Sequence, residues 1–303
     1  MIIPTRDCRA FLGHAMSSVR LQEIDDIEII VVDDGSSDGT DQWLGEATLR
    51  DPRIIPLQGE GKGPSFARNL ALSHARGRFV ALLDADDVWW PEKLARQLTY
   101  HERRPDVVFS FTDYLHVDMK GAVHGTCFEY WKPRYAQRDV EGFLVVPDAE
   151  LEILAANAVG TSTVVAQLRY LQNANGFATD SHSAEDWELW LRLARLGEVA
   201  CTSAVTMSYL MRPTSVTQNR ATRIEAMRKI IAPYEGRRDR PGRQAWRRAM
   251  SRLEIAEAEQ SRLLGAHWAA GGAHAKAFAR WPDLRTARAA VADFTAACGL
   301  GRS

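Results

Sequence analysis

The feature that most constrains how this chain folds is a repeated unit in its first 110 residues, in which a short apolar run precedes a helix-like segment. Residues 27–32, which are β-branched except for Glu28, and residues 79–83 form apolar runs, as expected for strands buried on both faces of a parallel sheet. Segments with helical spacing of apolar residues follow at 40–49 and beyond Pro91. Repeated βα units of this kind predict an α/β fold with a doubly wound, mostly parallel sheet flanked by helices.

Acidic clusters follow two of these predicted strands directly. Asp33 and Asp34 come after the first run, and Asp84 and Asp86 come after the second. Parallel sheets bind ligands at the carboxyl ends of their strands, so we expect both clusters to open on one crevice. Two carboxylates at such an end can share one hard divalent cation with diphosphate oxygens. A lone Asp-x-Asp is more often a turn or a helix cap, but two clusters in successive units favour a site.

The second part of the chain is less regular. We expect strands at 107–111 and 157–167 and a strong helix at 183–196, with Trp187 and Trp190 spaced along one face. That spacing predicts that at least one of the two tryptophans belongs to the core.

Composition and cysteine usage exclude several classes of protein. Hydrophobic residues make up 46% and charged residues 25%, which excludes disordered, collagen-like and disulfide-scaffold proteins. The 4 cysteines form no Cys-x-x-Cys pair and no zinc-spaced cluster. The sequence has no run of about 18 apolar residues and no long apolar leader. We therefore expect a cytoplasmic protein, peripheral at the inner face of the membrane at most.

The formal net charge of −1 hides a strong asymmetry. Residues 1–219 contain 21 Lys and Arg against 31 Asp and Glu, whereas residues 220–303 contain 17 against 8. This predicts a boundary near residue 220, followed by a basic helical C-terminal extension. The near-zero total gives no reason to expect a nucleic-acid partner.

The extension at 220–303 is predicted to form helices broken at Pro233, Pro241 and Gly271-Gly272. Three alternatives stay open for it: a solvated appendage, a contact with an anionic membrane surface, or an oligomerisation element. Residues 220–252 contain 11 basic against 3 acidic residues, which supports the membrane alternative.

Several segments within residues 1 to about 219 can be compared with known families. They are IIPT (2–5), EIIVVDDGSSDGT (28–40), DPRI (51–54), GKGPSFARN (61–69), GRFVALLDADDVWWPEKL (77–94), NGF (175–177) and SAEDWELWLRLA (183–194). In these segments and in their order, the chain resembles the family 2 glycosyltransferases of the GT-A fold. The family usually has a few residues before the first of these segments, which raises the alternative that the native start lies upstream of Met1.

This resemblance implies a Rossmann-like sheet with a nucleotide-binding half at about 1–110 and an acceptor half at about 111–219. It implies a hexosyl- or N-acetylhexosaminyl-type transferase that uses a nucleotide-sugar, above all a UDP-sugar. The acceptor would be a saccharide or a lipid-linked saccharide in cell-surface polysaccharide or glycolipid assembly. The implied cofactor is Mn²⁺ or Mg²⁺, and a single catalytic base implies inversion of the anomeric centre.

The resemblance also implies roles for individual residues. Asp186 would be the catalytic base, and Asp84 and Asp86 would bind the metal. The donor would contact Pro4, Thr5, Asp34, Arg68, Asp84 and Arg212, and the acceptor would contact Glu185 and Trp187. Two positions depart from the family pattern: Arg6 replaces a common aromatic residue, and Arg212 replaces a frequent His. Arg212 cannot ligate a metal, but it can add positive charge beside the leaving diphosphate.

Two other classes of function stay open. A nucleotidyltransferase can use a related sheet with acidic metal ligands. That class is expected to have a Gly-rich loop with a basic residue near the N-terminus, and residues 4–13 lack such a loop. A non-catalytic binding or scaffold protein could keep the same fold. Without the family resemblance, the simplest interpretation of Asp186 is a carboxylate at a helix N-terminus, where the helix dipole favours negative charge.

Overall fold

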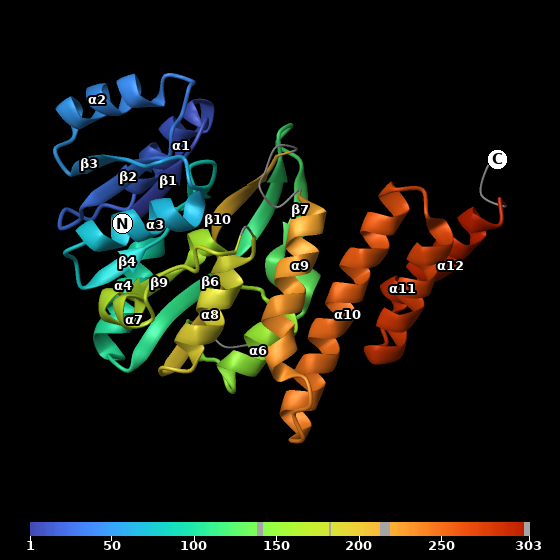
Figure 1. Ribbon diagram of the computed structural model, residues 1–303. Coiled ribbons are helices and arrows are strands. Elements are labelled where there is room, and N and C mark those ends of the chain that lie inside the picture. The colour runs from blue at the N-terminus through green and yellow to red at the C-terminus, as the bar shows by residue number, and fades with distance from the viewer. Residues whose placement is uncertain (138–141, 182, 213–218, 300–303) are drawn as a thin grey trace. The chain divides into compact units, whose positions relative to one another are not determined.

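The computed structural model describes residues 1–137, 142–181, 183–212 and 219–299, which fall into two compact units (Figure 1). The first unit comprises Met1–Ile153, Asn157–Asp180 and Glu185–Pro213. The second comprises Leu154–Ala156, Ser181–Ala184 and Thr214–Ser303. The assignment of separate roles to 1–219 and 220–303 stays a prediction.

The N-terminal part of the first unit contains a three-stranded parallel sheet in the order β1-β2-β3. Its strands are β1 (Ile2–Thr5), β2 (Ile29–Asp33) and β3 (Ile54–Gln58). Every residue of β2 is buried, as its β-branched run predicts. The register pairs Thr5 with Asp33, so both side chains lie at the carboxyl ends of neighbouring strands. The flanking helices are α1 (Arg9–Arg20), α2 (Thr40–Arg50) and α3 (Pro64–His74), of which α3 packs on β1 and β2.

A seven-stranded sheet continues from the first one, with the central order β4-β9-β6-β10-β5. These strands are β4 (Phe79–Ala81), β9 (Val165–Gln167), β6 (Val107–Asp118), β10 (Glu198–Met211) and β5 (Val88–Trp89). Two short strands, β7 (Val123–Thr126) and β8 (Leu144–Val145), pair with β6 and β10. A parallel bridge between Ile2 and Leu82 joins the two sheets, and the Leu83 N–H donates to the Ile2 carbonyl at 3.0 Å. The residues after β4 therefore reach the same edge as the ends of β1 and β2.

The α/β class with flanking helices is confirmed, and the sheet as a whole is mixed. The expected parallel arrangement holds for β1, β2 and β3. In the second sheet β9 lies antiparallel between β4 and β6, and only the pair of β6 and β10 is parallel among the described strands. The 14-residue strand β10 was not predicted, because its apolar residues form neither a continuous buried run nor a regular alternation with polar residues.

The prediction of one strand over 157–167 is wrong for most of that range. Only Val165–Gln167 is a strand, and Thr161–Thr163 forms the 3₁₀ turn η2. The Thr163 hydroxyl donates to the Gly160 carbonyl at 2.6 Å, so a side chain satisfies backbone that a strand would have paired.

The helix predicted at 183–196 is present as α8 (Glu185–Ala194) and packs on β6. Trp187 and Trp190 are only 1% and 0% exposed, so both belong to the core. The Trp190 ring lies 5.4 Å from that of Phe109. The other short helical segments before residue 180 are α4 (Lys93–Arg103), α5 (Cys127–Trp131), η1 (Arg134–Gln137), α6 (Ala149–Ala156) and α7 (Leu168–Asn173), of which α6 ends in the second unit.

The second unit is helical. Its elements are α9 (Arg220–Ile231), η4 (Ala232–Tyr234), α10 (Arg240–Leu263), α11 (His267–Arg280) and α12 (Leu284–Ala297). The predicted break at Gly271-Gly272 is wrong, because both glycines lie inside α11. A Cβ on Gly271 would come within 2.7 Å of the Phe294 ring, so this glycine permits close packing of α11 on α12. Throughout the described part of the chain, no helix is both long and apolar enough to cross a membrane.

One glycine contact supplies a test of this fold. Gly176 has a φ of +65°, and a Cβ there would collide with the side chain of Asn69. Asn69 clamps Phe177 through two hydrogen bonds of 2.8 Å to its backbone N–H and carbonyl. We expect Gly176→Ala to lower the free energy of unfolding by about 2 kcal/mol or more in urea titrations, because strain adds to loss of the clamp. Gly121→Ala is the control, since φ is +81° with nothing within 4 Å; an equal loss there would contradict the argument.

Candidate active site

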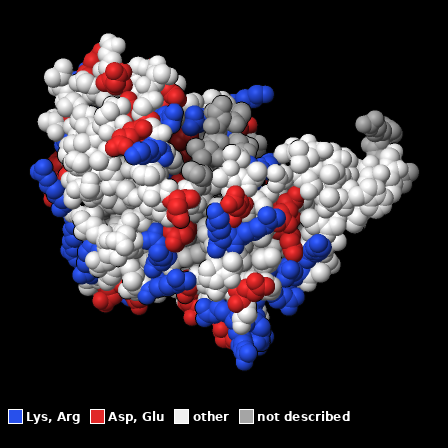
Figure 2. Space-filling model, viewed as in Figure 1, with Lys and Arg blue, Asp and Glu red and all other residues white. Residues whose placement is uncertain are grey.

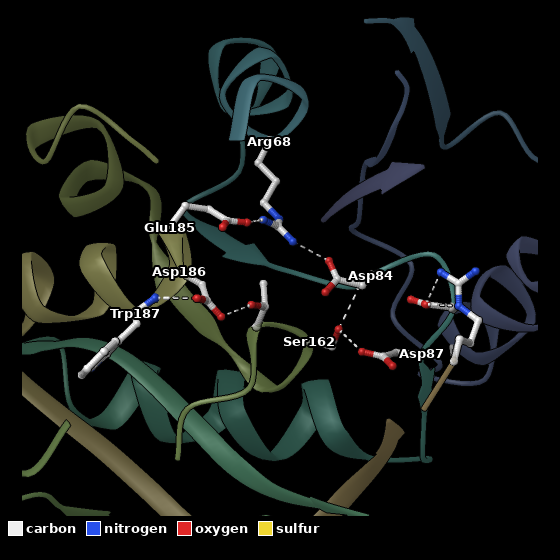
Figure 3. Close-up of polar contacts among 10 residues, drawn as sticks. Arg68, Asp84, Asp87, Ser162, Glu185, Asp186 and Trp187 are labelled. Atoms are coloured by element: carbon white, nitrogen blue, oxygen red, sulfur yellow. Dashed lines mark hydrogen bonds and ion pairs between the residues drawn. The ribbon is translucent and has the colours of Figure 1, made fainter. Parts of the chain in front are cut away.

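Acidic residues from two distant parts of the sequence meet beyond the carboxyl end of β4 (Figure 3). Asp84, Asp86 and Asp87 lie in the connection from β4 to β5, and Glu185 and Asp186 form the first turn of α8. The acidic loop follows β4 because the buried apolar strand ends where its polar residues begin.

Arg68 on α3 joins these two groups of acids. Its Nη1 donates to Glu185 Oε1 at 2.9 Å and its Nη2 donates to Asp84 Oδ1 at 2.8 Å. The Arg68 side chain is only 6% exposed, and its guanidinium lies 5.1 Å from the centre of the Phe177 ring. Burial opposes the charge, but the two carboxylates outweigh it and raise the pKa of Arg68. Figure 3 shows the guanidinium between the two acids.

Asp186 is held on both carboxylate oxygens. Oδ2 accepts from the Thr161 hydroxyl at 3.0 Å, and Oδ1 accepts from the Trp187 backbone N–H at 2.6 Å. Burial, followed by the neighbouring carboxylate of Glu185, raises the pKa of Asp186 to about 6. A carboxylate that titrates near neutral pH is well suited to accept a proton during a reaction.

Ser162, the residue after Thr161, holds the acidic loop. Its Oγ accepts from the Asp84 backbone N–H at 2.9 Å and donates to Asp87 Oδ2 at 2.6 Å. Together with Arg68, these contacts close a ring that runs through Asp84, Arg68, Glu185, Asp186, Thr161 and Ser162. Sequence reasoning missed Thr161, Ser162 and Asp87 as site residues. The signal for Thr161 and Ser162 was the run of hydroxyl residues at 161–163, which is also typical of turns. Asp87 directly follows Asp86 in the acidic cluster.

Arg212 reaches the acidic loop from the end of β10. Its Nε donates to Asp86 Oδ2 at 2.7 Å and its Nη2 lies 2.6 Å from the same oxygen. The guanidinium also lies 4.9 Å from the centre of the Phe11 ring. Burial and then the charge of Asp84 raise the pKa of Asp86, and Arg212 opposes that shift. The predicted donor residue Arg212 and the predicted metal ligand Asp86 are therefore direct partners.

The ends of β1 and β2 contribute a second part of the site. Asp34 accepts from the backbone N–H groups of Gly61, Lys62 and Gly63 at 2.9, 3.2 and 2.6 Å, so it closes the loop before α3. Pro4 and Thr5 lie in β1, and their predicted place in a nucleotide pocket stays a prediction. A predicted contact of Asp34 with the base stays a prediction.

Two buried polar atoms at these strand ends lack partners. Among the described residues, Thr5 Oγ1 and Asp33 Oδ2 have no hydrogen bond, although Asp33 Oδ1 accepts from the Ser36 N–H at 2.9 Å. Such orphaned groups are rare in protein interiors unless a ligand or water satisfies them. The register places Thr5 and Asp33 side by side, which makes this pair a candidate contact for a bound nucleotide.

The structure contradicts the predicted acceptor contact of Trp187, whereas that of Glu185 stays a prediction. The Trp187 indole N–H donates to the Ile153 carbonyl at 3.0 Å, and its buried ring has no surface on which a sugar could stack. The Glu185 carboxylate is occupied by Arg68. Trp187 belongs to the apolar face by which α8 packs on β6. Glu185 supplies a negative charge to the buried guanidinium of Arg68.

The donor set is compatible with a divalent cation that shares its coordination with a ligand. In the ranges that the structure describes, no three His, Cys, Asp or Glu side chains gather as a metal-binding group. Asp84 and Asp86 offer hard carboxylate oxygens, and each also carries an arginine partner. Mg²⁺-type sites use one or two carboxylates and complete their shell with phosphates and water, so the residues fit a cation brought with a diphosphate.

Comparison with known proteins adds the family to this geometry. The model of glycosyl transferase family 2 matches residues 1–190. An uncharacterized glycosyltransferase of Rickettsia felis is 30% identical over 197 residues, which make up 64% of this chain and 30% of that protein. The match thus spans less than a third of that relative. UDP-Glc:alpha-D-GlcNAc-diphosphoundecaprenol beta-1,3-glucosyltransferase WfaP of Escherichia coli is 28% identical over 222 residues, 73% of this chain and 80% of that protein.

The fold has a counterpart among solved structures. The mannosyltransferase PcManGT of Pyrobaculum calidifontis, in complex with GDP-Man and Mn²⁺, superposes with a TM-score of 0.64. The superposition covers 99% of this chain and 80% of that one at 21% sequence identity, which shows a shared fold. Because the family model covers well over half of the sequence, the chain belongs to glycosyl transferase family 2.

Proposed function

We propose that the protein transfers a hexosyl or N-acetylhexosaminyl group from a UDP-sugar to a hydroxyl of a lipid-linked saccharide, in the assembly of a cell-surface polysaccharide or glycolipid. The observation that carries this proposal is the closed ring that holds Asp186 and Asp84 on one scaffold. Such a ring keeps a proton acceptor and a diphosphate-binding loop at a fixed separation. The name of the relative WfaP, which specifies a UDP-sugar and a diphosphoundecaprenol-linked acceptor, supports the substrate class.

Asp186 is proposed as the general base. Removing the acceptor proton makes the hydroxyl a stronger nucleophile, and a raised pKa lets this carboxylate take the proton near neutral pH. One base opposite the leaving group favours a single displacement with inversion at the anomeric carbon. Glu185 is tied to Arg68 and is proposed to position the base rather than to touch the acceptor.

The donor side is proposed to consist of Asp84, Asp86, Arg68 and Arg212. Asp84 and Asp86 would hold Mn²⁺ or Mg²⁺, which would supply Lewis-acid stabilisation of the leaving diphosphate. The guanidinium of Arg212, which now neutralises Asp86, would add a second positive charge there. Arg68 would keep the Asp84 carboxylate oriented.

The nucleotide is proposed to lie over the ends of β1 and β2. Pro4 and Thr5 would line its pocket, and Asp34 would approach the base as it holds the loop at Gly61–Gly63. The unpartnered oxygens of Thr5 and Asp33 would gain hydrogen bonds from the bound nucleoside. Measurement of nucleotide release with a panel of UDP- and GDP-sugars tests this proposal, and no release with any donor would contradict it.

The second unit is proposed to contact the inner face of an anionic membrane, where a lipid-linked acceptor would lie. Figure 2 shows basic and acidic side chains mixed over α9 and α10 and a mostly uncharged surface over α11 and α12. Around the turn between α10 and α11, Leu263, Leu264 and Trp268 are 70%, 77% and 63% exposed. Exposed Leu and Trp beside basic residues are typical of surfaces that enter the headgroup region of a bilayer.

The pH dependence tests the assignment of the base. Because the pKa of Asp186 is about 6, turnover should rise as pH increases through 6 and then level off. Asp186→Asn should lower turnover by at least about 100-fold while UDP binding persists. Glu188→Gln, on the same helix, is the control. Asp186→Asn should not lower the free energy of unfolding at pH 7.5. Folding raises the pKa of Asp186, so its ionisation in the folded state above pH 6 costs stability, and the neutral Asn avoids that cost. Wild-type turnover of the Asn variant would refute the assignment of the base.

Nucleotide binding in the presence of metal tests the donor side. We expect UDP to raise the melting temperature of the wild type more with Mn²⁺ than with EDTA, because the diphosphate completes the coordination shell. Asp86→Ala should remove the Mn²⁺-dependent part of the shift, and Asp41→Ala, which alters an exposed residue of α2, should not. An equal UDP shift in Mn²⁺ and EDTA would show that the cation has no part in donor binding.

Flotation with lipid vesicles tests the membrane contact. The full chain should float with vesicles that contain anionic lipid, and serine substitutions at Leu263, Leu264 and Trp268 should lower the bound fraction at least about tenfold, because buried apolar area is lost. Leu49→Ser is the matched control, since Leu49 is 89% exposed on α2. Equal flotation of the two variants would contradict the proposed contact.

A further inference from the structure

The turn η2 at Thr161–Thr163 lies between the two groups of acids. Thr161 donates to Asp186, the proposed base, while the next residue, Ser162, donates to Asp87 and accepts from the Asp84 backbone. Neighbouring residues of one turn therefore hold the base on one side and the diphosphate-binding loop on the other. Only one peptide unit, which is planar and stiff, lies between the Cα atoms of Thr161 and Ser162. This short link limits how far the base and the acidic loop can move apart.

The turn itself is anchored to the core. The Trp89 indole N–H donates to the Ser162 carbonyl at 2.7 Å, and Gln97 Nε2 donates to the Thr163 carbonyl at 3.0 Å. Trp89 is 1% and Gln97 is 0% exposed, so both donors are held by the surrounding core. A hydroxyl fixed in this way can impose its own direction on the carboxylate that it contacts.

We propose that Thr161 is a positioning residue for Asp186. The Thr161 hydroxyl orients the Asp186 carboxylate towards the acceptor and favours the ionised form of that carboxylate. This inference rests on the proposed role of Asp186 as general base. The Trp187 N–H holds Oδ1 from the backbone of α8, and Thr161 holds Oδ2 from η2, so the carboxylate plane is fixed by two elements. Without Thr161, Oδ2 would lose its hydrogen bond from the turn.

The charges around Asp186 determine the direction of the effect. Glu185 on the same helix raises its pKa, and Arg68 on α3 lowers it. The Thr161 hydrogen bond works in the same direction as Arg68, because a donor stabilises the charged carboxylate. Loss of this donor should therefore raise the pKa of Asp186 further and move the acidic limb of the activity profile to higher pH.

The chain supplies a matched control within the same turn. Thr163 also has a buried hydroxyl, but this hydroxyl donates to the Gly160 carbonyl at 2.6 Å and makes no contact with the proposed base. A purely structural role of the turn would give Thr161→Val and Thr163→Val similar effects on stability and no change in pH dependence. A positioning role affects only the variant at 161.

The experiment compares kcat, KM and the pH profile of the full-length variants. Thr161→Val should lower kcat about tenfold with little change in the KM of the nucleotide-sugar, and should move the acidic limb up by about half a pH unit to one unit. Thr161→Ser should restore both properties, and Thr163→Val should change neither. Thr161→Ala provides the same comparison if the valine variant does not fold. An unshifted acidic limb in both variants that lack the hydroxyl would overturn the proposal.

A second measurement does not depend on turnover. Because folding raises the pKa of Asp186, the free energy of unfolding should fall between pH 5 and pH 8, and the fall should be larger in Thr161→Val than in Thr163→Val. An equal fall in the two variants would overturn the contact. If the wild type turns over no nucleotide-sugar but this difference is present, the proposed function fails while the contact between Thr161 and Asp186 holds.

Discussion

The buried guanidinium of Arg68 is the interaction on which the rest of the site depends. It takes one carboxylate from the loop after β4 and one from the start of α8, at 2.8 and 2.9 Å. These acids are separated by about a hundred residues of chain, and without a cation between them their like charges would repel in a region of low dielectric. Removing one partner from such a buried group typically costs about 3–5 kcal/mol. The guanidinium therefore holds the loop after β4 and the start of α8 together. These carry the proposed metal ligands and the proposed base.

The site balances charge in pairs. Asp84 faces Arg68 and Asp86 faces Arg212, whereas Asp186 is bound by a neutral hydroxyl and a backbone N–H. The paired carboxylates are suited to binding cationic partners, although burial also raises the pKa of Asp86. Asp186 has no direct ion pair, and burial and the charge of Glu185 raise its pKa to about 6. The proposed metal ligands and the proposed base thus differ in their direct partners, although all are aspartates.

Several elements could be predicted from the sequence because their signals are local. The buried run of β2, the acidic residues that end β2 and β4, and the amphipathic pattern of α8 each depend on residues within one element. The motif that includes Arg68 made it a predicted donor residue, but its link to Glu185 depends on the fold, which brings α3 and the start of α8 together. The resemblance placed Trp187 at the acceptor, whereas helix geometry turns its side chain away from that of Asp186 and its indole N–H donates to the Ile153 carbonyl.

The sequence by itself determined the family and the α/β class, because ordered motifs and strand patterns depend on residues that lie close together in the chain. The tertiary structure decided which cation faces which carboxylate, and it revealed that a short turn of hydroxyl residues ties the proposed base to the acidic loop. Neither result has a local signal. Hydroxyl side chains bond to whatever acceptor the packing brings within about 3 Å, so their partners exist only once the strands and helices are assembled.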